Sequence, residues 1–164
     1  MVADSGFALD LEIQLVTDQS ALPAGADFAT WIRAALNGAA EARSGVAAQG
    51  AMNLRLVGLE EGAELNSAWR KKAGATNVLA FPGPRLQAGF PVEYGDLVIC
   101  LPVVNREAAE QGKDPVAHLA HLVVHGTLHL LGYTHDDPPT AAQMESLETR
   151  VLARLGIPDP YVML

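Results

Sequence analysis

All five histidines of this 164-residue chain lie within residues 118–135. Three of them, His121, His125 and His129, are four residues apart, so in an α-helix they form one row along a face. The residues around them are mostly apolar, and Gly132 follows where a left-handed residue can end the helix. The segment is therefore predicted to be a largely buried helix after which the chain reverses.

That reversal brings His135 back over the end of the helix, where it can meet His125 and His129. Two histidines at i and i+4 on a helix can chelate one metal ion. Three neutral imidazoles leave a coordination position open for water, as catalytic sites do, whereas closed structural sites take four protein ligands. We therefore expect one divalent metal ion at this helix. The alternative, that these are ordinary core or surface histidines, is disfavoured by the spacing across the glycine.

The other residues of the helix have different expectations. His118 and His121 lie toward its start, where no turn supplies a third ligand, so His118 is interpreted as solvated. His121 is either packed or a neighbour that supports a ligand. Gly126 stands where H-E-x-x-H peptidases carry their catalytic Glu, which disfavours peptide hydrolysis by that mechanism. Gly126 and Thr127 put little bulk beside the site, which suits a large substrate such as a phosphodiester.

Strands and helices are predicted from the period of the apolar residues. Strands are expected over residues 7–16, 52–58, 76–82 and 94–102. Helices are expected from Phe28 to Leu36, over residues 60–72, and over Val103–Gln111, Pro115–Leu131 and Thr140–Leu155. The connection over residues 83–93 is too rich in Pro and Gly for a crossover helix, so the last two strands are predicted antiparallel and the earlier pairings parallel. Residues 1–164 are thus predicted to form a single α/β domain, with a small, mixed, mostly parallel four-stranded sheet packed with about five helices.

Composition narrows the class of protein. Apolar residues make up 49% of the chain and charged residues 18%, which is typical of a globular fold. The net charge of −8 argues against a basic, sequence-independent nucleic-acid binder. A single cysteine, Cys100, excludes a disulfide framework within one chain and is interpreted as a buried thiol in a reducing compartment. Neither a signal peptide nor a membrane-spanning run is visible, so we expect a cytoplasmic protein without membrane association.

The one tight basic run in this acidic chain is Trp69-Arg70-Lys71-Lys72. Cations at the end of a helix favour the helix dipole, so the run needs no function. Alternatively, Arg70 offers a planar fork to a phosphate and Trp69 can stack on a base. From the residues alone both interpretations of Arg70 stay open, and Trp69 is better explained as a core residue.

Together these segments resemble a known family. "HGTLHLLGYTH" is similar to the signature of the YbeY family, the bacterial endoribonuclease and rRNA maturation factor. The flanking segments "LNSAWRKKAGATNVLAFP", "GDLVIC" and "MESLETRVLARLGIPDPY" resemble the family's neighbouring segments in the same order. The resemblance covers residues 65–161, so chance is a poor explanation for it.

The resemblance implies a hydrolase of single-stranded RNA with one zinc ion, acting at the 3′ end of 16S rRNA and in ribosome quality control. It implies His125, His129 and His135 as ligands, and Arg70 as the family's arginine, expected to stabilise charge on the phosphate. The family's Asp before the third histidine is Thr134 here. Asp136 or Asp137 is a candidate substitute, unless the pair is only part of a solvated turn before Pro138 and Pro139.

Two functions of other classes remain beside this one. The chain can be a ribosome-associated assembly factor whose metal is mainly structural, or a generic metallohydrolase. An open coordination position favours an enzyme. The acidic net charge favours recruitment through a ribosome or ribosomal protein over unaided RNA binding, because acidic surface repels phosphate. Imidazole ligands also suit nickel, copper or iron, so zinc is an expectation from the family alone.

Overall fold

The computed structural model describes residues 8–43, 45–46, 49–84 and 92–161. The strands in this part of the chain are β1 (Ala8–Leu15), β2 (Gln49–Val57), β3 (Val78–Pro82) and β4 (Val92–Cys100). The α-helices are α1 (Phe28–Ala42), α2 (Leu59–Arg70), α3 (Leu101–Gln111), α4 (Pro115–Leu130) and α5 (Pro138–Arg154), and a short 3₁₀ turn η1 covers Gln19–Ala21. The predicted α/β class and the number of elements are confirmed.

Helices α3 and α5 each begin two residues earlier than predicted, and proline explains both. α3 starts at Leu101 and α5 at Pro138, each with proline in its first turn, where the missing N–H has no partner to lose. In α5 the Asp137 side chain accepts from the Thr140 backbone N–H, and the Thr140 hydroxyl lies 3.2 Å from the Asp137 N–H. This capping box fixes where the chain turns from the histidine segment into α5.

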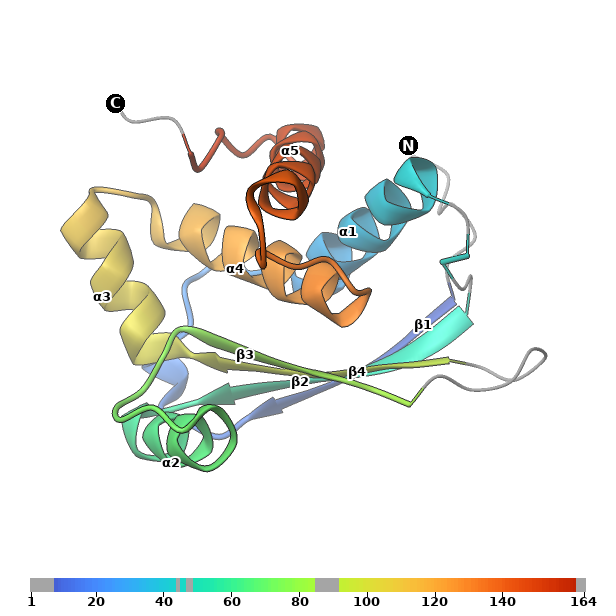
Figure 1. Ribbon diagram of the computed structural model, residues 1–164. Helices are drawn as coiled ribbons and strands as arrows, with labels where there is room; N and C mark the ends of the chain where they lie inside the picture. Colours follow the sequence, from blue (N-terminus) through green and yellow to red (C-terminus); the bar gives the residue numbers. More distant parts are fainter. Residues whose placement is uncertain (1–7, 44, 47–48, 85–91, 162–164) are drawn as a thin grey trace.

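The strands form one sheet in the order β1-β2-β4-β3. β1 pairs with β2 and β2 with β4 in parallel, while β3 pairs antiparallel with β4. The mixed, mostly parallel sheet is thus confirmed, including the antiparallel pair expected from the Pro- and Gly-rich connection. Figure 1 shows α1, α3, α4 and α5 on one face of the sheet and α2 on the other.

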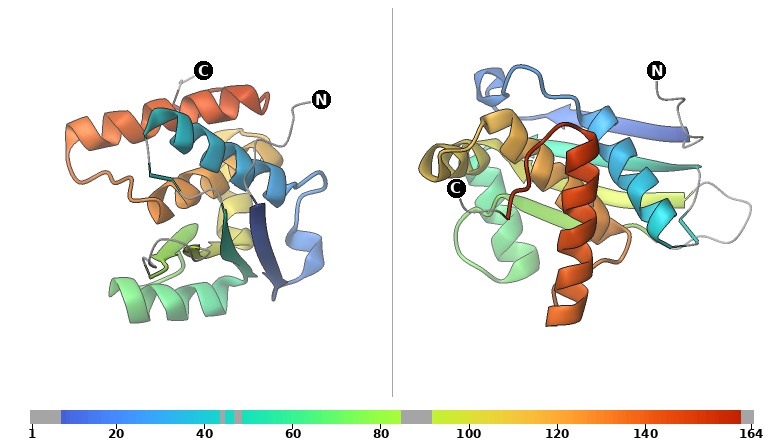
Figure 2. Two further views of the ribbon diagram at one scale, coloured as in Figure 1. Left: turned by 90° about the vertical axis from the view of Figure 1, so that its right-hand side faces the viewer. Right: turned by 90° about the horizontal axis from the view of Figure 1, so that it is seen from above.

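Helix α4 lies at the centre of the molecule. It packs on the sheet on one side, α5 crosses over its other side, and α1 lies alongside it, as Figures 1 and 2 show. The core between the sheet and the helices includes Ile32, Leu54, Leu97, Leu119 and Val123. A second cluster joins α1, α4 and α5. Both sides of α4 are therefore fixed by packing.

Gly126 lets α4 lie close to the sheet. A Cβ at this position would collide with Leu97 of β4 and press on Val78 of β3. Thr127 is fully buried, and its hydroxyl donates to the Val123 carbonyl at 2.7 Å. The expectation that these two residues leave room for substrate is corrected for Thr127, whose small size serves only the packing of helix on sheet. Gly126 serves that packing and also lines the pocket beside His125 and His129, as expected.

Trp69 is not the core residue that we expected. Its side chain is 66% exposed and touches Phe81 edge-on, with the ring centroids 5.7 Å apart. It sits in the last turn of α2, on the face of the sheet opposite the other α-helices, where no described segment covers it. Cys100 is buried as expected. No helix in the described ranges has both the length and the apolar character needed to cross a membrane.

Candidate metal centre

The structure brings the imidazoles of His125, His129 and His135 together. The ring centroids of His125 and His129 are 4.6 Å apart, and those of His135 lie 4.7 and 4.9 Å from them. One ring nitrogen of each lies within 4.8 Å of the others. Gly132, with a φ of 98°, ends the helix and turns the chain, as the sequence predicted. The group can therefore hold a metal ion.

His125 and His129 each have their Nδ1 atom fixed by a hydrogen-bond acceptor. The Nδ1 of His129 donates to the Tyr133 carbonyl at 2.9 Å, and the Nδ1 of His125 donates to the carboxylate of Glu148. Each Nε2 is then left with a lone pair, and the two Nε2 atoms face each other at 3.1 Å. Two lone pairs at this distance repel unless a cation lies between them. A tetrahedral ion with metal–nitrogen bonds of about 2.0–2.1 Å places its nitrogens about 3.3 Å apart, so the pair fits.

The protonation of His129 also suits a ligand. Burial, helped by the charges of His125 and His135, lowers the pKa of His129 below its usual range, although the Tyr133 carbonyl acts in the other direction. The neutral ring keeps its Nε2 lone pair at neutral pH.

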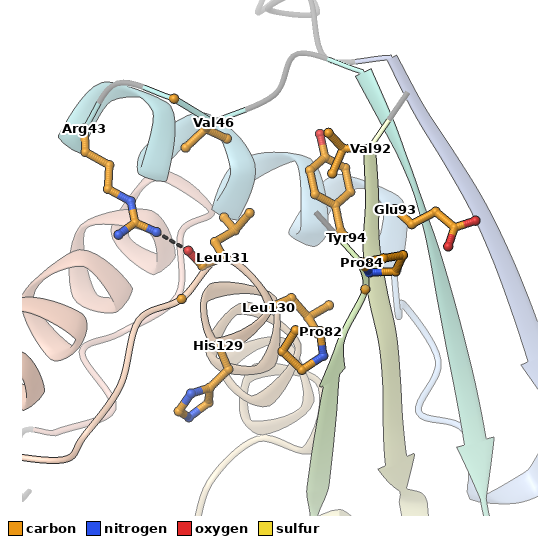
Figure 3. A pocket seen from close by; sticks show the side chains of 13 residues that line it. Arg43, Val46, Pro82, Pro84, Val92, Glu93, Tyr94, His129, Leu130 and Leu131 are labelled. Carbon is orange, nitrogen blue, oxygen red and sulfur yellow. Dashed lines mark hydrogen bonds between the residues drawn. The ribbon is translucent and has the colours of Figure 1, made fainter. Parts of the chain in front are cut away.

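The turn that carries Tyr133 is braced by α1. The guanidinium of Arg43, the residue that follows α1, donates to the Leu131 carbonyl, as the dashed line in Figure 3 shows. The same group lies 4.3 Å from the centroid of the Tyr133 ring, a cation–π contact. Arg43 therefore holds both sides of Gly132, and through the Tyr133 carbonyl it helps to hold His129.

The three imidazoles open into a pocket of about 520 Å³. The same pocket is lined by Arg70, Asn77, Thr134 and Asp136, among others. The structure thus places the predicted arginine and Asp136 at the mouth of the histidine site. Both side chains are exposed.

The end of α2 presents Arg70 to this pocket. Lys71 follows in the left-handed conformation, with a φ of 58°, and its N–H bonds to the Asn66 carbonyl. The buried Asn66 side chain donates to the Gly74 carbonyl at 2.8 Å and so secures the loop beyond. Arg70 is therefore placed by a fixed helix end, and the neighbouring Trp69 faces a different groove on the α2 side of the sheet.

His118 is buried, with 6% of its surface exposed, so the interpretation of it as solvated was wrong. Its Nε2 lies 3.0 Å from Glu107 of α3, and the same carboxylate accepts from the Asn77 amide at 3.0 Å. Burial lowers the pKa of His118, while the contact with Glu107 acts in the opposite direction. His118 lies outside the three-histidine group and helps to fix Asn77 in the pocket wall.

Glu148 of α5 is the residue of this site that the sequence did not reveal. It is 0% exposed and contacts His125, His121 and the hydroxyl of Tyr161. Burial raises the pKa of Glu148, but the hydrogen bonds from these groups and the charge of His125 outweigh it and lower the pKa to about 2. His121 thus lies beside this carboxylate and not beside His129 or His135. The available signal was an acidic residue at helical spacing among the apolar Met144, Leu147 and Val151.

A second hollow, of about 590 Å³, adjoins the first. The two share His129 and Pro82, and the second is lined by apolar groups such as Leu130 and Val92 together with polar ones such as Arg43 and Glu93. Figure 3 shows this hollow between the end of α4 and the ends of β3 and β4. A long substrate therefore has room on more than one side of His129.

Comparison with known proteins points to one family. A family model described as "Endoribonuclease YbeY" matches residues 13–156. A protein named "Endoribonuclease YbeY" from Stutzerimonas stutzeri (strain A1501) is 50% identical over 159 residues, covering 93% of this chain and 91% of its own. One of the same name from Alkalilimnicola ehrlichii is 51% identical over 158 residues, with 94% and 92% covered.

A solved structure has the same fold. The solution structure of a Thermotoga maritima protein matches with a TM-score of 0.51 and 21% sequence identity, covering 93% of this chain and 99% of that one. At this identity the match shows the fold alone.

Proposed function

Because this chain belongs to the endoribonuclease YbeY family, we propose that it is a metal-dependent hydrolase that cuts single-stranded RNA. The observation that carries the proposal is the pair of Nε2 atoms of His125 and His129, 3.1 Å apart with both Nδ1 atoms engaged elsewhere. His135 adds a third nitrogen and leaves the rest of the shell to water or substrate. We propose one ion, with zinc as the first candidate.

A divalent ion at this position would polarise a phosphoryl oxygen and make a bound water more acidic. The chain's own groups would do the rest. Arg70 lines the same pocket and can grip a phosphate with its fork, adding positive charge where the phosphoryl oxygens become more negative. The adjoining hollow at His129 and Pro82 offers space for a neighbouring nucleotide.

Asp136 is proposed as the carboxylate that replaces the family's Asp, because Thr134 stands at the position before His135. Thr134 and Asp136 both line the pocket, so the exchange would keep an acidic group at its mouth. We propose that it accepts a hydrogen bond from a water or from a metal ligand next to the site, as carboxylates beside metal ligands commonly do.

We further propose that the RNA is the 3′ end of 16S rRNA and that a ribosome or ribosomal protein delivers it in the cytoplasm. The net charge of −8 supports assisted delivery, since an acidic surface repels a free RNA strand. The single buried thiol of Cys100 suits a reducing compartment. The same acidic surface also favours the second candidate, an assembly factor whose metal is structural.

One experiment tests the proposal and separates the two candidates. Metal content and cleavage of a single-stranded RNA are measured on the same purified sample, for the wild type and for His129→Ala. The variant should lose most of its metal and its cleavage, because two imidazoles hold a divalent ion poorly. His118→Gln is the matched control on the same helix and should keep the metal.

A wild-type protein that binds metal but cuts no RNA would support the assembly factor. Unchanged cleavage by a metal-free His129→Ala protein would overturn the metal-dependent mechanism. Thermal unfolding of each variant shows whether it is folded.

A further inference from the structure

Glu148 is a fully buried carboxylate whose hydrogen-bonding groups all belong to the surroundings of the histidine site. One oxygen accepts from His125 Nδ1, and the other lies 3.2 Å from His121 Nε2 and accepts from the Tyr161 hydroxyl. Three chain segments thus meet at one side chain: α4, α5 and the residues after α5. A buried charge is costly unless several donors compensate it, and here the donors are present.

The contact with His125 decides which nitrogen of that ring is free. A carboxylate accepts only, so Nδ1 of His125 carries a proton, and in the neutral ring Nε2 then carries the lone pair. The same bond fixes the rotation of the ring, because α4 and α5, which carry the two side chains, are packed together. Nε2 is therefore turned toward Nε2 of His129, at 3.1 Å.

Glu148 is itself held in place from behind. The Tyr161 ring lies edge-on to His121, with centroids 5.4 Å apart, while its hydroxyl donates to Glu148. The Tyr161 N–H bonds to Asp159 at 2.8 Å, which shapes the segment that carries the ring. Tyr161 is therefore linked to His125 by two successive hydrogen bonds, one from Tyr161 to Glu148 and one between Glu148 and His125.

We propose that Glu148 is a positioning residue that sets the tautomer and direction of His125 for metal binding, and that Tyr161 and His121 hold Glu148 in turn. The proposal rests on the proposed function, since it concerns the ion assigned to the three histidines. It differs from a purely structural role in one respect. A structural carboxylate would support the fold, whereas a positioning carboxylate also sets the nitrogen that binds the ion.

The first test needs no variant and no RNA. Nitrogen-15 NMR of the histidines in metal-free wild-type protein reports which ring nitrogen of His125 is protonated. We expect the Nδ1–H form. A ring that carries its proton on Nε2 and none on Nδ1 would overturn the proposal, and this holds even if the protein proves not to cut RNA.

The second test is Glu148→Gln, which keeps the shape of the side chain and removes its charge. Removing an outer carboxylate of a metal-bound histidine typically weakens metal binding about 10- to 100-fold, and we expect that loss for Zn²⁺ in competition with a chromophoric chelator. The His125 signals of the metal-free variant should show a mixture of tautomers. Tyr161→Phe should weaken zinc binding less, because Glu148 keeps its two histidine partners.

Glu145→Gln is the matched control, one turn earlier on α5, where the side chain makes no described contact with a histidine. It should bind zinc like the wild type. Wild-type affinity and a single His125 tautomer in Glu148→Gln would overturn the proposal. A wild-type protein that binds no divalent ion would instead remove the proposed function, while the tautomer measurement still decides the role of Glu148 in orienting His125.

Discussion

His125 and His129 project from a helix packed between the sheet and α5, whereas His135 and Arg70 lie in exposed parts of the chain on the same pocket. Each of these two half-buried histidines has its Nδ1 fixed, by Glu148 or by the Tyr133 carbonyl. In the described residues His135 makes only ring contacts with the other two imidazoles. We call His125 and His129 the buried half of the site and His135 and Arg70 the exposed half. The buried half is held more rigidly than the exposed half.

The difference suggests a division of labour. A ligand fixed in advance loses little conformational freedom when an ion binds, so the buried half should set metal affinity. An exposed group costs the fold little and can adapt to a substrate, so the exposed half should act on RNA. Substitutions of His125 or His129 should then change stability and metal binding together. Loss of the exposed His135 should weaken metal binding with little effect on stability, and substitution of the exposed Arg70 should change catalysis alone.

Arg70 gives the largest effect that we expect in the exposed half. Arg70→Ala should lower the single-turnover rate of RNA cleavage about 100- to 1000-fold, because a donor aimed at developing charge is lost. Arg70→Lys should recover part of the rate, since it keeps the charge without the fork. Metal content and melting temperature should match the wild type, as Arg70 is exposed and is not among the three histidines.

Trp69→Ala is the matched control for Arg70. The two residues are neighbours in sequence, yet Trp69 lines the groove on the α2 side and Arg70 lines the histidine pocket. Trp69→Ala should cut RNA at the wild-type rate. Wild-type rates in both Arg70 variants would return this arginine to the role of a cation at a helix end, and a large drop in melting temperature would make it structural.

The stability of the metal-free protein tests the same division directly. His125→Ala leaves the buried Glu148 without one of its three donors, which should cost about 1–3 kcal/mol in the free energy of unfolding. His135→Ala removes an exposed ring and should change that free energy by no more than about 0.5 kcal/mol. Urea unfolding of both proteins in excess chelator measures the difference.

Equal losses in these two variants would mean that the buried and exposed halves contribute alike to the fold. The division between them would then be wrong, even with the observed geometry unchanged. A lower free energy of unfolding for His125→Ala alone would show that the site contributes to the stability of the fold through Glu148.

The sequence was sufficient for the local part of this site. His125, His129 and His135 fall within one helix and its following turn, so helical period and a glycine stop predict that they meet. The strand pairings followed in the same way from the connections between strands. Arg70 was found through family resemblance, because nothing local says that the end of α2 faces the end of α4.

Contacts between separate elements were not predicted, and they account for the errors. Glu148 lies 23 residues beyond His125, and only the packing of α5 on α4 brings the two together. His118 was read as solvated because a lone histidine on a helix carries no mark of what covers it, and here α3 supplies Glu107. Trp69 was read as core for the opposite reason, since its large apolar ring sits where no element packs over it.

The last effect that we expect depends on pH and concerns His118, which is paired with a carboxylate like His125 but lies outside the three-histidine group. Burial has the largest influence on the pKa of His118 and lowers it in the folded protein below the ordinary value of 6.5. Below about pH 6.5 the unfolded chain therefore binds a proton at this position more readily than the folded chain does. The free energy of unfolding should fall as the pH decreases through this range, by at most about 1.4 kcal/mol per pH unit from this one group.

His118→Gln removes that contribution. Urea unfolding of chelator-treated wild type and variant at a series of pH values should give a shallower loss of stability for the variant between about pH 6.5 and 5. Above about pH 7.5 His118 is neutral in both states, so the two curves should run parallel there, which serves as the internal control. Parallel curves at low pH as well would show that the contact with Glu107 cancels the effect of burial. A carboxylate partner would then be enough to let a buried histidine take up a proton. Burial alone would then not explain the difference between the buried and exposed halves of the site.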